Sequence, residues 1–202
     1  MDIVFPTINV HTLFVMAHIL GVTLGLGAAT ISDILFFQAT KDGRFEAKEW
    51  EIMKLLSRVI WVGVALVILS GAWFLSEYLL DPEKARFLQN PKIWAKASMV
   101  GIIFLNGLFL HWKVFPIFES MVEGAKKATK FPANMTMVFT SGAISVTSWY
   151  SAFIMGTWRG LSFTLEYWQI MAVYAGILAF AIGVANCFGR WQTRKLVTGK
   201  KG

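Results

Sequence analysis

The chain has 202 residues, of which 56% are hydrophobic and only 15% are charged, and its mean hydropathy is +0.57. Soluble domains carry about 25% charged residues, so this composition excludes an ordinary soluble fold and indicates one integral membrane domain, residues 1–202, in a lipid bilayer. The net charge of +7 suits anionic headgroups. No basic face with interleaved aromatic residues lies outside the apolar segments, so a nucleic-acid partner is not expected.

Five apolar segments are long enough to cross the hydrocarbon core, which takes about 20 residues. They predict an all-α, polytopic membrane bundle with spans at Val10–Gln38, Leu55–Leu80, Ile93–Phe118, Asn134–Trp158 and Tyr167–Phe188. The third span has an alternative end at His111, because Lys113 and Pro116 interrupt its last turns. The fourth is the most polar, being rich in serine and threonine, so we expect it inside the bundle.

The basic residues predict the orientation, because Lys and Arg concentrate in cytoplasmic loops. Fourteen of the nineteen lie on one side: in the loops after the first and third spans and in the C-terminal tail. We therefore expect the N-terminus outside, the C-terminus in the cytoplasm and the protein in a bacterial inner (plasma) membrane. The first span lacks the basic start and cleavage site of a signal peptide, so we expect it to be retained.

The first span combines glycines with an intramembrane histidine. Gly21, Gly25 and Ala29 recur every four residues, which allows either close helix packing or the approach of a planar cofactor. His18 lies on the same face, about 12 Å into the membrane. It is predicted either to ligate a metal, with iron or copper as the candidates, or to bond to the polar fourth span. His11 is a further metal-ligand candidate, or an interfacial residue.

Asp33 lies ~22 Å along the same helix from His18, so the two belong to separate sites. The expected role of Asp33 is an ion pair with Arg58 at the start of the second span, with proton handling as the alternative.

The third span carries the remaining candidates. Lys96 lies at about the depth of His18, and Lys96, Met99 or water could stand opposite His18 on a haem; Lys96 could also extend to the headgroups. His111 lies about 14 Å deeper and would form a second metal site. Asn106 needs a hydrogen-bond partner, expected on the fourth span.

Two candidates follow on the outer side. The stretch SVTSWYSAF, residues 145–153, could line a cofactor or quinone pocket or simply pack helices. Arg159 is the one basic residue between the last two spans, and would either pair with a haem propionate or anchor the interface.

The segments AHILGVTLGLGA, residues 17–28, and PKIWAKASMVGIIFLNG, residues 91–107, resemble helices of a superfamily of small helical membrane proteins. This superfamily includes the HemJ-type protoporphyrinogen oxidases and the CopD-type copper-resistance proteins. The resemblance covers about residues 9–111. It implies a haem b site and, for a HemJ-like protein, a functional pair at His18 and Lys96.

Three functions follow from these observations. The first is a haem b redox protein that exchanges electrons with a quinone or a membrane redox complex. The second is a HemJ-like oxidase of protoporphyrinogen. The third is a non-catalytic membrane subunit or a copper-handling protein.

Overall fold

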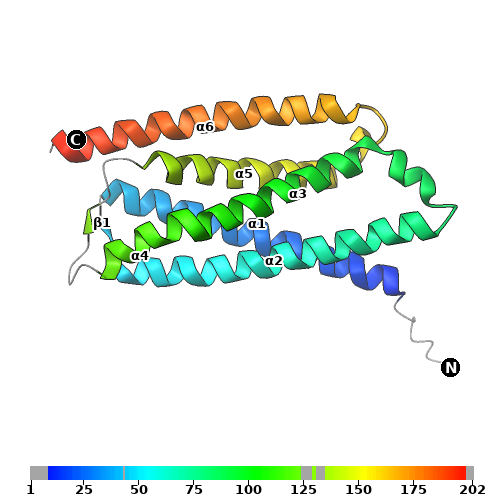
Figure 1. The fold of residues 1–202 in the computed structure, drawn as a ribbon, viewed down its shortest axis with the longest axis horizontal. Helices are drawn as coiled ribbons and strands as arrows, with labels where there is room; N and C mark the ends of the chain where they lie inside the picture. Colours follow the sequence, from blue (N-terminus) through cyan, green and yellow to red (C-terminus); the bar gives the residue numbers. More distant parts are fainter. Residues whose placement is uncertain (1–8, 43, 124–128, 131–134, 199–202) are drawn as a thin grey trace, which may run out of the picture.

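The computed structural model describes residues 9–42, 44–123, 129–130 and 135–198, and these are almost entirely helical (Figure 1). Four helical segments in this part are long and apolar enough to cross a membrane: Val10–Thr40, Ala47–Leu80, Pro91–Ser120 and Tyr167–Gln192. The predicted all-helical fold is confirmed, and four of its helical segments suit a membrane by length and composition. The basic residues Lys126, Lys127, Lys200 and Lys201, on which the predicted orientation partly depends, lie outside the described residues.

Helices α1 (Val10–Asp42) and α2 (Ala47–Leu80) form an antiparallel hairpin. The short strand β1 (Arg44–Phe45) lies between them and pairs with β2 (Thr129–Lys130). Helix α2 begins after Glu46, whose backbone N–H donates to the Glu49 carboxylate at 2.8 Å and so satisfies a free donor at the helix start.

The third long helical rod consists of an α-helix, a π-helical turn and a second α-helix. A 3₁₀ turn, η1 (Ala85–Gln89), precedes α3 (Pro91–Phe109), and Asn90 caps α3 by accepting from the Lys92 N–H at 3.2 Å. The rod continues through a π-helical turn, η2 (Leu110–Val114), into α4 (Phe115–Glu123). The alternative end at His111 is therefore wrong. The wider π turn accommodates Pro116, whose ring would clash with the carbonyl four residues earlier in a regular α-helix.

Helix α5 (Thr136–Thr157) is the polar fourth segment, and it lies inside the bundle as predicted. It packs against α1, α3 and α6, and it is not among the four apolar helices. A 3₁₀ turn, η3 (Arg159–Leu161), leads towards α6 (Tyr167–Thr198). Side-chain hydrogen bonds join α5 to α6: Asn186 Nδ2 donates to Thr140 Oγ1 at 2.9 Å, and Ser148 Oγ lies 2.7 Å from the Tyr174 hydroxyl.

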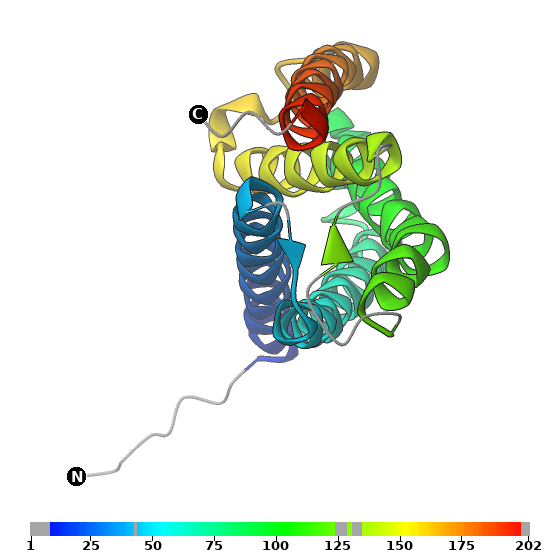
Figure 2. The same ribbon diagram turned by 90° about the vertical axis from the view of Figure 1, so that its left-hand side faces the viewer.

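Seen end on, α1, α2, the α3–α4 rod and α5 surround a common interior, and α6 lies outside α5 (Figure 2). Large apolar side chains are exposed on the outside of α1, α2 and α6, among them Leu69 at 65% and Phe180 at 74%. Exposure of this extent on long apolar helices suits lipid contact.

The interior changes character along the axis. An aromatic cluster that includes Phe36, Trp50, Phe118 and Phe139 fills the end near β1. A smaller apolar cluster lies in the middle, formed by Ala29, Val64, Ile103 and Trp149. His18 precedes this middle cluster on α1, whereas Asp33 follows it, so the two polar residues lie on opposite sides of it.

Candidate functional site

His18 of α1 is held by a serine of α2. Its Nδ1 atom lies 2.8 Å from Ser70 Oγ, and Ser70 is buried. The single hydroxyl proton of Ser70 is donated to backbone carbonyls of its own helix, those of Leu66 and Val67. His18 must therefore donate its Nδ1–H to Ser70, which leaves the Nε2 lone pair of the neutral imidazole free.

An aromatic side chain contacts both histidines of α1. Phe74 of α2 lies edge-on to His18, with ring centroids 5.7 Å apart, and its centroid is 5.6 Å from that of His11. The two imidazoles thus contact the same phenyl ring.

Lys96 of α3 faces the same region. Its side chain is half-buried, and its positive charge acts on the His18 ring. Within the described part of the chain, Lys96 forms no hydrogen bond or ion pair. The bundle thus places an unpaired ammonium group near His18, as the depth estimate from the sequence predicts.

Met99 does not join this site. It is 2% exposed and packs in a cluster with Ala95, Met155, Ile170 and Tyr174, which lies between α3, α5 and α6. Its side chain therefore contributes to the packing of α6 on the bundle, and its role as a ligand opposite His18 stays a prediction.

The space beside Gly21 and Gly25 of α1 is filled by protein. A Cβ at Gly21 would lie 2.8 Å from Leu66 Cβ, and one at Gly63 of α2 would lie 2.6 Å from the Gly25 backbone nitrogen. A Cβ at Gly25 would overlap with the indole ring of Trp149. These glycines let α1, α2 and Trp149 pack closely, which is the packing alternative, and cofactor binding at Gly21 and Gly25 stays a prediction.

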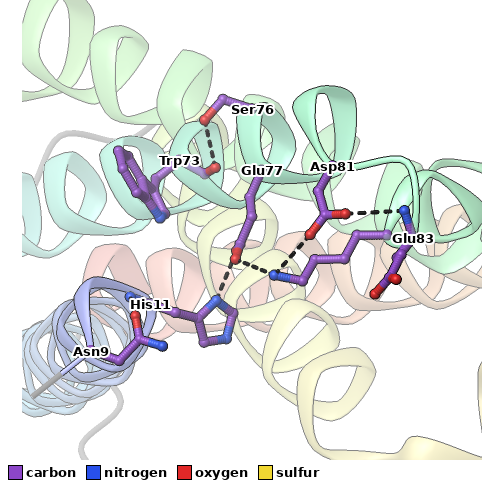
Figure 3. Close-up of polar contacts among 8 residues, drawn as sticks. Asn9, His11, Trp73, Ser76, Glu77, Asp81 and Glu83 are labelled. Atoms are coloured by element: carbon purple, nitrogen blue, oxygen red, sulfur yellow. Dashed lines mark hydrogen bonds and ion pairs between the residues drawn. The ribbon is translucent and has the colours of Figure 1, made fainter.

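His11 belongs to a charged cluster at the start of α1 (Figure 3). Its Nδ1 lies 2.7 Å from Glu77 Oε2, and the other Glu77 oxygen accepts from Lys84 Nζ at 2.6 Å. Lys84 also lies 3.4 Å from Asp81 Oδ2. The hydrogen bond to Glu77 raises the pKa of Lys84 above its ordinary value. His11 therefore has a carboxylate partner, and its role as a metal ligand stays a prediction.

Arg159 is exposed in η3, and the structure gives it no partner among the residues it describes. The neighbouring carbonyl of Trp158 accepts from Lys92 Nζ at 2.6 Å, which fixes this turn to the start of α3. The predicted contact of Arg159 with a haem propionate stays a prediction.

His111 lies in the π turn η2, away from His18. The Trp61 indole N–H donates to His111 Nδ1 at 3.3 Å, and the His111 ring stacks on Phe115 with centroids 4.6 Å apart. Because Nδ1 accepts, the proton of the neutral ring is on Nε2. A metal at Nε2 would have to displace this proton, and the role of His111 as a metal ligand stays a prediction.

A cavity that the sequence did not predict lies beside His111. Its volume, measured as room for the centres of water molecules, is about 100 Å³, and its polar lining includes Asp33, Ser57, Asn106, His111 and Ser145. As predicted, Asn106 bonds to the fourth helix, donating to the Ser141 carbonyl at 2.9 Å.

Asp33 has no cationic partner. No ion pair of Asp33 or Arg58 occurs among the described residues, Arg58 is exposed, and Asp33 Oδ2 is buried without a hydrogen-bond partner. The predicted Asp33–Arg58 pair is wrong because Ser57 faces the cavity and the next residue of an α-helix points about 100° away from it. The sequence contained a signal that Asp33 faces the interior, because it continues the four-residue repeat of Gly21, Gly25 and Ala29.

The stretch after Ser145 serves packing. Tyr150 bonds to Thr30 at 3.1 Å, Ser148 bonds to Tyr174, and Trp149 is buried. Within the described residues, no group of three His, Cys, Asp or Glu side chains is arranged to hold a metal ion. Comparisons with family models, with curated proteins and with solved structures found no match for this chain.

Proposed function

We propose that this chain is an integral membrane protein that binds haem b through His18 and transfers electrons. The observation that carries the proposal is the hydrogen bond between His18 and Ser70. This bond fixes the orientation of the ring and leaves the Nε2 lone pair available to a metal. Metal-ligating histidines almost always donate their other ring N–H in this way.

The donor set favours haem over a metal ion held by side chains alone. Haem brings its own ring of nitrogen ligands and needs only axial ligands from the protein, and a single oriented imidazole meets that need. A copper site would need further soft or imidazole ligands near His18. His11 is bonded to Glu77 instead, and Met99 packs elsewhere.

Lys96 would form an ion pair with a porphyrin carboxylate. An unpaired ammonium in a partly buried position is costly unless an anion meets it, and a propionate supplies that charge. Bound haem would supply one-electron chemistry, while His18, Ser70 and Lys96 position it. The electron partner we infer is a quinone or a membrane redox complex.

One observation favours a second candidate, a HemJ-like protoporphyrinogen oxidase. The charge of Lys96 acts on His18, so the two residues that the family resemblance pairs also lie near each other here. Turnover of protoporphyrinogen by the purified protein would distinguish this enzyme from an electron carrier.

We further infer that α5 is a fifth span, that the N-terminus is outside and that the protein resides in a bacterial plasma membrane. Because α5 is covered by α1, α3 and α6, its serines and threonines need not face lipid. Single cysteines at Lys84 and Glu51, in a Cys187→Ser background, test the orientation. An impermeant thiol reagent should label the first from outside the cell and leave the second unlabelled.

The test of haem binding is the visible absorption spectrum of the purified protein, oxidised and dithionite-reduced. We expect a Soret band and reduced α and β bands in the wild type and in His111→Ala, and their loss in His18→Ala. A colourless wild type from haem-replete cells would overturn both haem proposals. Equal spectra in all three proteins would overturn the role of His18.

A further inference from the structure

We propose that the cavity between α1, α2, the α3–η2 segment and α5 is a proton-binding site, in which the Asp33 carboxyl takes up and releases the proton. This inference goes beyond the proposed function and does not depend on haem. It rests on the surroundings of Asp33, on the fixed state of His111 and on the room for water.

Asp33 has no cation to balance a negative charge. Its Oδ2 is buried and unbonded within the described structure, and its Oδ1 faces Gly142 of α5, 3.8 Å from where a Cβ would stand. No Lys or Arg is among the described residues that line the cavity. An ionised carboxylate there would be an uncompensated charge inside the membrane, which is expensive, so a cation must accompany it.

His111 cannot supply that charge while its bond to Trp61 persists. Its Nδ1 accepts from the indole N–H, so the ring is neutral with its proton on Nε2. From the other elements around the cavity, α2 contributes Ser57 and α5 contributes Ser145, and neither is charged at ordinary pH. Among the described residues that line this cavity, Asp33 and His111 are the only acidic or basic side chains, and of these two it is Asp33 whose Oδ2 is buried without a hydrogen-bond partner.

The cavity offers room and partners for water. One water needs about 10–15 Å³ by this measure, and the volume is about 100 Å³, so several waters can be held. The hydroxyls of Ser57 and Ser145 have no hydrogen-bond partner among the described residues and can bind them. Ligand pockets are typically 300–1,000 Å³, so the size favours water and a proton over an organic ligand.

The apolar middle cluster separates this site from His18. This cluster consists of Ala29, Val64, Ile103 and Trp149, and the Trp149 indole packs against Gly25. The cavity of Asp33 and the region of His18 are therefore two separate sites.

Infrared difference spectroscopy of the full-length protein in liposomes, between ~pH 5 and ~pH 9, tests the proposal. We expect a pH-dependent carbonyl stretch of a protonated carboxylic acid that is absent from Asp33→Asn and displaced in Asp33→Glu. Glu51→Gln, which removes an exposed carboxyl of α2, should retain the band.

A band that survives in Asp33→Asn would overturn the proposal, as would the absence of any such band in the wild type. A wild-type band that is lost when sodium or potassium is added at constant pH would also overturn it, because an alkali cation would then be the ligand. Because the measurement does not require haem, a colourless protein with a titrating Asp33 would refute only the proposed function.

Discussion

Trp149 of α5 occupies the space that a side chain at Gly25 of α1 would need. A Cβ built on Gly25 would overlap with the indole, and the backbone of Gly25 is also within 2.6 Å of a Cβ position at Gly63 of α2. Three helices therefore meet at this one glycine, and their meeting point closes the interior between His18 and Asp33.

Replacing Gly25 by alanine should destabilise the bundle. The added methyl group would force Trp149 or the α1–α2 contact apart, and overpacking of this kind costs about 1–3 kcal/mol. Thermal unfolding in detergent measures this loss of stability. Gly27→Ala is the matched control, since a Cβ at Gly27 has no neighbour within 4 Å and an alanine there should leave stability unchanged or raise it. Equal stability of Gly25→Ala and Gly27→Ala would contradict this packing role.

The helices could be predicted from the sequence because apolar length is a strong local signal. The predicted first and fifth spans begin at Val10 and Tyr167, as do α1 and α6. The partner of Asn106 on the fourth span was also predictable, since a buried amide in lipid must bond to a neighbouring helix.

The site could be predicted only in part, because rotation about each helix axis is set by packing. The depths of His18 and Lys96 follow from the rise per residue, but the burial of Met99 against α6 does not. Nor does spacing show whether a glycine face receives a cofactor or the indole of Trp149. The tautomer of His18 depends on Ser70, which lies 52 residues away in sequence.

Ser148 and Tyr174 should be energetically coupled. Ser148 Oγ donates to the Ile144 carbonyl, so the Tyr174 hydroxyl donates to Ser148, and this bond connects α5 to α6. Interhelical hydrogen bonds in membranes average about 0.6 kcal/mol and reach about 1.7 kcal/mol. A double-mutant cycle of Ser148→Ala and Tyr174→Phe measures the coupling. Additive effects within error would show that α6 is held by apolar contacts alone.

Removing the Ser70 hydroxyl should weaken haem binding without abolishing it. Ser70→Ala frees the His18 ring to rotate, and loss of such an orienting partner typically lowers metal affinity about 10–100-fold. Titration of haem into the haem-free protein measures the change. Ser76→Ala is the control, because Ser76 bonds to a carbonyl of the same helix but not to His18. The same affinity in Ser70→Ala and the wild type would argue against an oriented His18 ligand.

Glu77 should control the titration of Lys84 at the end of the bundle where α1 begins. The hydrogen bond from Lys84 to Glu77 is the largest cause of the raised pKa of Lys84, ahead of its bond to Asp81. Because a raised lysine pKa stabilises the folded state below that pKa, this contribution is present at neutral pH and is lost as the pH rises through it. Glu77→Gln should therefore lower the pKa of Lys84 more than Asp81→Asn does, as followed by NMR of isotopically labelled lysine. A larger effect of Asp81→Asn would mean that Lys84 is held by its own turn, and that His11 and Glu77 form a separate pair.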